Sequence, residues 1–391
     1  MAEYIPFVHT DKDCRILLST YSDAATVRLS LETGSKTSPK IPANIRRWVD
    51  GGVDGLDKWP AILHAPGPYL AHIQKYAGHD QIGSSVFQAK PDESVVESFA
   101  SAILDDCRKL NPGWISVPQL PQAHDSSRNK INRALAKAAG RWAIESAFQG
   151  SLILPIIFTH QEQVNSKTAR NPRVRLAAEC FTKARAKGVW VVESSLYDQE
   201  GSKTFEHKRF PALVQLHEEL KAALPDDAIS IAGPYWGMNL VLWARGLATY
   251  PAIGIGNSYQ YHIPGGRIMA GKDRIAIPPL RRWAIASQHL KHWLRDALRR
   301  IPKSDPAYFE FQNLEKEFDT IALDGRTQVA RFYRDWFAKI AASPRPGRAL
   351  TLYQDLSTAY VLGKTLPEMP KDEGTARKSD RVAKQFMLNC L

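Results

Sequence analysis

The sequence contains few cysteines and no long apolar run. The chain has only four cysteines, and they lie far apart: Cys14, Cys107, Cys180 and Cys390. Their spacing matches neither a disulfide framework nor a zinc site, and it fits a reducing compartment. The longest apolar run, Leu152–Phe158, is too short to span a bilayer. The first residues, MAEYIPFVHTDKDC, lack the basic and apolar regions of a signal peptide. We therefore expect a cytoplasmic protein that does not bind membranes.

Several common catalytic signatures are also missing. The sequence has no Walker A motif and no glycine fingerprint of a dinucleotide-binding fold after its first strand. It has no nucleophile elbow of the α/β-hydrolase kind. A His-x-His or HExxH zinc pattern is absent as well, which disfavours a metal-dependent hydrolase. We expect neither a cofactor nor a metal ion.

The chain has an excess of positive charge. Its 391 residues carry a formal net charge of +12. Such an excess favours a polyanionic partner, because each neutralised phosphate releases counterions. A basic surface that only aids solubility is the alternative. The length suits one barrel with a helical appendage.

Short apolar runs alternate with segments of helical period between residues 100 and 280. This alternation indicates βαβ units and a parallel sheet. The sequence predicts strands at Arg15–Ser19, Ala61–His64, Trp114–Val117, Leu152–Phe158, Val189–Glu193, Ala228–Ala232, Ala252–Gly254 and Arg274–Ile277. Eight strands with helical crossovers favour an α/β fold of the (β/α)8 TIM-like barrel type over an open sheet.

Helical segments separate most of these strands. They are predicted at Asp92–Leu110, Ser126–Phe148, Pro172–Lys187 (ending at Gly188), Phe210–Leu224 and Gly237–Leu247. A strongly basic helix is predicted over Leu280–Arg300, and a further helical region over Glu310–Ile340. We therefore expect a barrel over residues 1–280, a basic helical extension over 281–366 and a polar, partly disordered tail over 367–391.

Candidate site residues follow the predicted strands, because barrel enzymes place their chemistry at the carboxyl ends of strands. A carboxylate there, such as Glu193, can stabilise an oxocarbenium-like transition state or activate water. It can equally be an ion-pair partner. His64 and His160 close two other strands and suit an acid, a base-edge donor or a structural role.

Two loops stand out by composition. Gly233–Gly237 reads Gly-Pro-Tyr-Trp-Gly, so Tyr235 and Trp236 are candidates to stack on a base, or aromatics that cover the barrel rim. Ile255–His262 is polar and aromatic, and its Asn257, Tyr259 and Tyr261 are hard to explain by core packing. Cations follow the second loop and are candidate contacts to a nucleic-acid backbone: Arg267, Lys272, Arg281, Arg282 and Lys291.

The order of these motifs resembles the tRNA-guanine transglycosylase superfamily, including its DNA-acting relatives, over residues 61–267. The run Ile62–Tyr69 is similar to the strand that ends in Asp-Ser-Gly-Gly-Phe in that family, and Ala65 occupies the place of the family's aspartate. Trp114–Gln119 followed by Arg141-Trp142-Ala143 resembles the base-recognising strand and its helix, which implies that Gln119 recognises the base.

The later motifs complete the resemblance. Leu154–His160 resembles the strand that ends in a base-binding glutamine, so Thr159 or His160 takes that place. Gly188–Ser195 resembles the strand whose glycines line the base pocket, where Glu193 intrudes. The pair Ile229–Gly246 and Ala252–Arg267 resembles the last motifs, in which Asn257 takes the place of the nucleophilic aspartate. The family's cysteine-rich zinc site has no counterpart.

These departures change the implied reaction. Covalent exchange needs an ionised nucleophile, and Asn257 cannot supply one. We therefore expect water to attack, which makes the chain a DNA glycosylase that flips out a modified base and leaves an abasic site. Asn257 would orient the water or the sugar, while Glu193 or Asp23 would supply negative charge. Gln119 suits a pyrimidine edge or a modified base more than a 7-deazaguanine.

A modified base suggests a biological role and leaves alternatives. Defence against phages whose DNA carries, for example, glucosylated hydroxymethylcytosine fits the altered pocket and the basic charge. DNA is favoured over RNA as the partner. The alternatives are a base-exchanging tRNA or DNA transglycosylase, a barrel that binds nucleic acid without catalysis, and an unrelated barrel enzyme acting on small metabolites.

Overall fold

The fold was analysed in a computed structural model of the whole chain. The residues that the structure describes are 4–8, 11–21, 27–30, 61–64, 92–108, 112–120, 122, 126–158, 161–193, 209–235, 237–255, 274–370 and 378–391.

The centre of the molecule is a set of parallel strands. Strands β4 to β8 form a continuous curled sheet, and the short strands β1 to β3 extend it, each parallel to its neighbour in sequence. Strand β1 also pairs in parallel with β8, which closes the ring. The strands are β1 (Ile5–Val8), β2 (Val27–Ser30), β3 (Ala61–His64), β4 (Trp114–Ser116), β5 (Ser151–Phe158), β6 (Gly188–Glu193), β7 (Ile229–Ala232) and β8 (Tyr250–Ile253).

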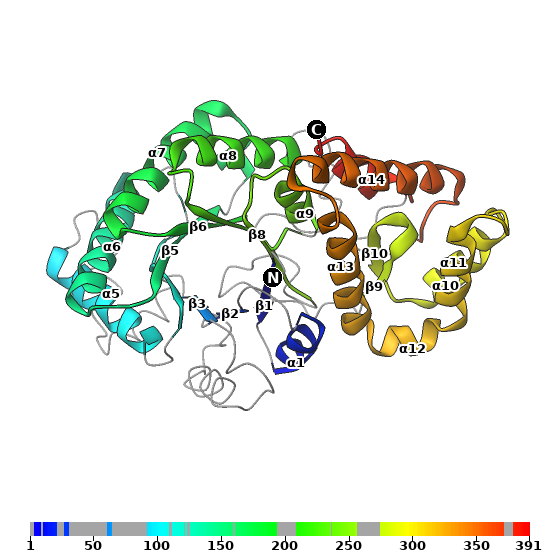
Figure 1. Cartoon of the computed structure of the whole chain (residues 1–391), viewed down its shortest axis with the longest axis horizontal. Coiled ribbons are helices and arrows are strands. Elements are labelled where there is room, and N and C mark those ends of the chain that lie inside the picture. The colour runs from blue at the N-terminus through cyan, green and yellow to red at the C-terminus, as the bar shows by residue number, and fades with distance from the viewer. Residues whose placement is uncertain are drawn as a thin grey trace.

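Helices cover the outer side of these strands (Figure 1). They are α1 (Asp11–Thr20), α5 (Glu93–Arg108), α6 (Ser126–Glu145), α7 (Lys167–Ala184), α8 (Arg209–Ala223) and α9 (Met238–Ala244), with the single turn η3 (Gln161–Gln163) before α7. The expectation of a mixed α/β fold with parallel strands is confirmed. Residues 31–60 and 256–273 lie outside the described part, so a complete alternation of eight strands with eight helices is not seen.

The strand sequences explain why two apolar layers form. Successive side chains of a strand point to opposite faces. In β5, Ile153 and Ile157 join an inner cluster with Trp190 and Val192 of β6. The residues between them, such as Leu154 and Ile156, pack in the outer cluster with the helices. Strands buried on both faces therefore need nearly continuous apolar runs, and β5 and β6 have them.

The described part of the chain resumes at Arg274 with a hairpin that the sequence did not predict. Strand β9 (Arg274–Ile277) pairs antiparallel with β10 (Arg282–Ile285) through the turn η5 (Pro278–Leu280). The prediction of Arg274–Ile277 as a barrel strand is therefore wrong. Arg15–Ser19, also predicted as a strand, lies in α1. The two strands that complete the ring, β1 and β2, are short and were missed.

The predicted basic helix over Leu280–Arg300 is wrong in its first half. Arg281 has a positive φ of 52° and ends η5, after which β10 is extended. The helix begins only after Ser287, whose hydroxyl accepts a hydrogen bond from the backbone N–H of Leu290. The helices of this region are α10 (Gln288–Leu298), α11 (Pro306–Lys316), α12 (Phe318–Leu323), α13 (Gly325–Ala341), α14 (Arg348–Thr365) and α15 (Arg381–Met387), with the turn η6 (Arg345–Gly347) before α14.

The C-terminal helices share a core with the strand ring. Helix α13 packs against α1 and β9, and α14 packs against α9 (Figure 1). Phe386 of α15 is fully buried and lies edge-on to Phe210 of α8, with ring centroids 5.7 Å apart. The expected polar tail is therefore a packed helix over residues 381–387. The predicted boundary at residue 280 falls inside η5, and the division into three parts stays a prediction.

Helix ends in α7 also differ from the prediction. The helix starts earlier than Pro172, because the hydroxyl of Ser166 accepts from the N–H of Ala169 and caps it. It ends at Arg185, which adopts the left-handed conformation, and Gly188 instead begins β6. In the described segments, no helix is long and apolar enough to cross a membrane.

Candidate functional site

A buried ion pair stands at the carboxyl end of β6. Glu193, the last residue of that strand, accepts hydrogen bonds from Nε and Nη2 of Arg209, at 3.0 and 2.6 Å. Arg209 is the first residue of α8. The two side chains are 1% and 5% exposed. The pair therefore joins the two ends of segment 194–208, which links strand and helix in sequence.

Strand alternation gives Glu193 its direction. It has the same parity as Val189 and Val191, whose side chains pack in the outer cluster with the helices, whereas Val192 belongs to the inner cluster. The carboxylate therefore faces the beginning of α8. The sequence left two interpretations for Glu193, a catalytic carboxylate or an ion-pair partner, and the geometry supplies the partner. Arg209 was missed, because nothing local in the sequence marks a contact 16 residues away.

Tyr235 lies close to Glu193 and is fully buried. Its hydroxyl donates to the carbonyl oxygen of Val191 at 2.6 Å. Burial, and secondarily the charge of Glu193, raises the pKa of Tyr235 well above its usual value. The indole N–H of Trp190 donates to the carbonyl of Gly233 at 2.7 Å, which ties the end of β7 to β6. Tyr235 thus locks two strand ends together, and in this conformation its ring is not available to stack on a base.

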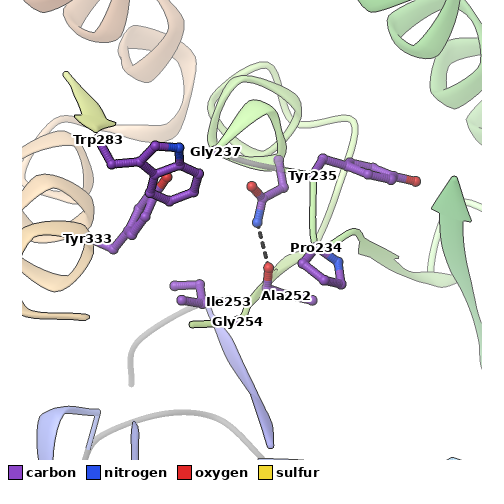
Figure 2. Close-up of a pocket in the computed structure, with 9 residues that line it drawn as sticks. Pro234, Tyr235, Gly237, Ala252, Ile253, Gly254, Trp283 and Tyr333 are labelled. Atoms are coloured by element: carbon purple, nitrogen blue, oxygen red, sulfur yellow. Dashed lines mark hydrogen bonds between the residues drawn. The ribbon is translucent and has the colours of Figure 1, made fainter. Parts of the chain in front are cut away.

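A small cavity lies next to this loop (Figure 2). It has a volume of about 10 Å³, which is space for about one water molecule. Trp283 of β10 and Tyr333 of α13 form one wall, with ring centroids 5.5 Å apart. Asn239 also lines the cavity, and its side-chain amide donates to the carbonyl of Ala252 at 2.7 Å. The cavity is too small for a nucleobase.

Gln119 belongs to a second polar cluster, in the segment after β4. It is 3% exposed, and its amide nitrogen donates to the carbonyls of Pro118 and Asn132, at 2.9 and 3.1 Å. The side chain of Asn132, in α6, accepts from the N–H of Leu120 and donates to its carbonyl. Both amides therefore shape this loop, and the Gln119 donors are already used. Base recognition by Gln119 would require these bonds to be exchanged.

The interior of the strand ring is mainly apolar. Its side chains come from alternate positions of neighbouring strands and include Ile157, Val192, Ile231 and Ala252. Ser116 ends β4 and has the parity of the inner face, and its buried hydroxyl has no hydrogen-bond partner among the described residues. Polar groups that act on a substrate must therefore come chiefly from the loops beyond the strands.

The three predicted phosphate contacts that are described have protein partners. Arg282 is 1% exposed, and its guanidinium donates to backbone carbonyls, including that of Lys378 at 3.2 Å. It is not available to a phosphate in this conformation. Arg281 donates two hydrogen bonds to the carboxylate of Asp355, at 2.6 and 2.8 Å. Lys291 forms an ion pair of 2.5 Å with Asp319 and keeps 19% of its side chain exposed.

The other predicted site residues lie outside the described residues. They are Asp23, His160, Trp236, Asn257, Tyr259, Tyr261, Arg267 and Lys272. His64 ends β3, with its backbone paired to β2, but its side chain is likewise outside the description. Of the named candidates, the structure thus brings Glu193 and Tyr235 together and leaves Gln119 in a separate cluster.

A buried histidine also escaped the sequence analysis. His217 of α8 is 1% exposed, and its ring lies edge-on to Tyr235 with centroids 6.1 Å apart. Burial lowers the pKa of His217 to about 3. The ring is therefore neutral at physiological pH, and its contacts are those of a packing residue.

Neither possible metal ligands nor comparisons with known proteins assign a function to these residues. Within the described residues, no group of three or more His, Cys, Asp or Glu side chains is placed to hold a metal ion. Comparisons with protein-family models and with curated proteins find no match to this chain.

Proposed function

We propose that this chain is a DNA glycosylase on a (β/α)8 barrel, which hydrolyses the N-glycosidic bond of a modified base and works in the cytoplasm. The observation that carries the proposal is the ring of parallel strands in a chain of net charge +12, with polar loops following the strand ends. Barrels of parallel strands carry their chemistry at these ends. A strongly basic chain suits a nucleic-acid substrate.

The reaction requires few parts. Water adds to the anomeric carbon of the nucleotide while the bond to the base breaks, and the base leaves with the bonding electrons. A general acid gives a proton to the departing nucleobase, and a general base takes a proton from the water. Negative charge near the sugar stabilises the oxocarbenium-like transition state. An abasic sugar and a free base result.

The ion pair changes the roles that we propose for Glu193 and for the other candidate residues. Arg209 balances the charge of Glu193, and the carboxylate faces α8. We therefore assign Glu193 a positioning role, in which the pair fixes both ends of segment 194–208. Asp23 becomes the main candidate for charge stabilisation, and Asn257 the candidate that orients water or sugar.

A base-release assay tests this proposal. The purified protein is incubated with plain, cytosine-modified, glucosylated phage and deazaguanine-containing DNA. Mild alkali then converts abasic sites into strand breaks, and mass spectrometry identifies the released base. We expect breaks in one modified DNA together with the matching free base. D23N and N257A should lower the rate by about 100-fold or more, the usual range for a lost acid–base or positioning group.

The alternatives give different results in the same assay. Incorporation of a radiolabelled free base without net base loss would identify an exchange reaction. Tight DNA binding without release from any substrate would identify a binding protein, and would contradict the proposal. Equal plaquing of modified and unmodified phages on expressing cells would contradict the defence role alone.

A further inference from the structure

The surface of α10 and of the turn that follows it is strongly basic. Residues 287–304 carry five lysines and arginines but only one carboxylate, that of Asp296, and they also contain two histidines. Helix α10 lies at the outer edge of the molecule, beyond β9 and β10 as seen from the strand ring (Figure 1). Its charge is therefore presented to the surroundings.

The helical period separates the side chains of α10 into a buried face and an exposed face. Leu290, Trp293, Leu294 and Ala297 are buried, and the helix packs on α11. The exposed positions 289, 292, 296, 299 and 300 recur mostly at intervals of three or four residues, so they lie on one side of the helix. An exposed lysine follows in the turn before α11. We call this set the outward row: His289, His292, Asp296, Arg299, Arg300 and Lys303.

Two other cations of α10 balance the acidic residues of the neighbouring helices. Lys291 forms an ion pair of 2.5 Å with Asp319 of α12. Arg295 forms an ion pair of 2.7 Å with Glu315 of α11. These two carboxylates are therefore already neutralised and do not offset the charge of the outward row.

The outward row itself keeps cations without a carboxylate partner. Arg300, Lys303 and the two histidines make no hydrogen bond or ion pair in the part of the chain that the structure describes. Asp296 accepts from Arg299 at 3.1 Å, and both side chains are more than half exposed. An exposed pair of this kind contributes little and exchanges readily. The row therefore has free donors and an excess of positive charge.

A helix on the outer side of the strand ring shows the opposite arrangement. Arg133 and Lys137 of α6 pair with Glu179 of α7 and Glu93 of α5. Three neighbouring helices thus balance these charges among themselves. The contrast indicates that the excess on α10 serves a partner outside the chain, because a solvated face can also be covered by paired charges.

The segment before α10 borders the carboxyl ends of the strands. Trp283 of β10 lines the small cavity together with Pro234 and Gly254, which follow the carboxyl ends of β7 and β8. Helix α10 begins shortly after β10. The outward row thus belongs to an extension that is anchored on the side of the ring where the proposed reaction takes place.

We propose that the outward row binds the phosphodiester backbone of duplex DNA beside the target base. From position 289 to 300 it extends about 16 Å at 1.5 Å per residue, and one strand of B-DNA offers a phosphate about every 3.4 Å along its axis. Several phosphates are therefore within reach. Contacts of this kind position the duplex without reading its sequence. The inference rests on the proposed function in one respect, that the substrate is DNA.

The composition of the exposed face favours DNA over an anionic membrane. Its exposed residues are all polar: Gln288, His289, His292, Arg295, Asp296, Arg299 and Arg300. A helix that binds a membrane surface also presents apolar side chains, which enter the lipid. Such side chains are not exposed on α10.

Fluorescence anisotropy of a labelled, unmodified duplex with the full-length protein tests this surface. Binding is measured between about 50 and 200 mM salt, and the slope of log K against log salt concentration reports the number of phosphate contacts. R300Q and K303Q should each reduce the slope by about 0.9, and the double variant by about twice as much. D296N removes the carboxylate of the row and should tighten binding by up to about fivefold.

The matched control is R108Q, which should leave the slope unchanged. Arg108 is exposed and ends α5, the helix that leads to the amino-terminal end of β4, away from the proposed reaction side. The proposal is overturned if the duplex does not bind, if R300Q and K303Q keep the slope of the unmodified protein, or if R108Q lowers it equally. Binding to phosphatidylserine vesicles that R300Q/K303Q abolishes, with DNA binding unchanged, would assign the row to a membrane and also overturn it.

The same variants separate this inference from the proposed function. Duplex binding through the outward row without release of any base would contradict the glycosylase activity alone. Base release by a protein whose salt slope does not respond to R300Q/K303Q would contradict the surface alone. Circular dichroism of each variant confirms that it is folded.

Discussion

At the scale of single residues, Glu193 and Arg209 form the most consequential contact near the strand ends. Both charges are removed from water, so each depends on the other. E193Q or R209Q removes one member of this buried ion pair, and we expect each to lower the free energy of unfolding by about 3–5 kcal/mol. The double variant should lose less than the sum of the two, because the interaction between the two side chains is lost in each single variant and can be lost only once.

Urea denaturation of the four proteins measures this coupling. The control is D227N, which breaks the exposed pair of Lys187 and Asp227 and should have a much smaller effect. Strict additivity of E193Q and R209Q would show that the two side chains do not depend on each other. That result would contradict the positioning role given to Glu193.

His217 predicts a specific dependence of stability on pH. Burial lowers its pKa to about 3 in the folded chain, against about 6.5 for an ordinary histidine. Below pH 6.5 the unfolded chain therefore binds a proton that the folded chain does not. The free energy of unfolding should be independent of this group above pH 6.5 and fall as the pH drops toward 3, at about 1.4 kcal/mol per pH unit.

H217L tests this linkage, because leucine is of similar size to histidine but cannot bind a proton. Relative to the unmodified protein, the variant should gain about 2 kcal/mol of stability between pH 7.5 and pH 5. Urea denaturation at the two pH values measures the difference. Equal changes in both proteins would mean that His217 is protonated as readily in the folded as in the unfolded state.

At the scale of elements, the contact between α6 and α7 depends on one glycine. A Cβ atom on Gly140 would meet the carbonyl oxygen of Lys183 and would lie 3.3 Å from the Cα atom of Ala184. Both are backbone atoms, so they yield only if a helix moves. G140A should therefore lower the free energy of unfolding by about 1–3 kcal/mol, despite the better helix propensity of alanine.

The matched substitution is G347A, in the turn before α14. A Cβ atom there has nothing within 4 Å, and the φ of −90° suits any residue. Thermal unfolding of both variants measures the contrast. A tolerated G140A would show that α6 and α7 do not approach as closely as described.

The elements also show what the sequence could predict. Strands β5 and β6 were predicted nearly to their ends, because apolar runs buried on two faces are unmistakable. Arg15–Ser19 failed since a short apolar run does not distinguish a strand from a helix. Arg274–Ile277 is a strand, but its local pattern does not reveal its antiparallel partner.

The candidate site was predictable only in part, for the same reason. The position of Glu193 at a strand end follows from the local pattern, whereas its partner Arg209 depends on how two elements meet. The burial of Arg282 was equally hidden, because charged residues in a basic stretch are usually solvated. Contacts between distant segments leave no periodic signal in one sequence.

At the scale of the whole molecule, the last helix belongs to the main core. Phe386 of α15 is fully buried, and it belongs to the same core cluster as residues of the strands and of α8. F386A should lower the free energy of unfolding by about 3–5 kcal/mol, the usual cost of removing a buried aromatic ring.

Leu388 provides the control for this prediction, because its side chain is 67% exposed. L388A should change the stability little, and urea denaturation compares the two variants. If F386A were as mild as L388A, the C-terminal segment would be peripheral, as its polar composition first indicated.

The whole molecule also frames the functional account. A ring of parallel strands, loops at the strand ends and an excess of basic residues together favour chemistry on a nucleic acid. The most direct test is release of a free base from modified DNA by the purified protein, followed by mass spectrometry. The account predicts a single released base, abasic sites in the same DNA and loss of both in D23N. No released base from any DNA, modified or plain, would contradict it.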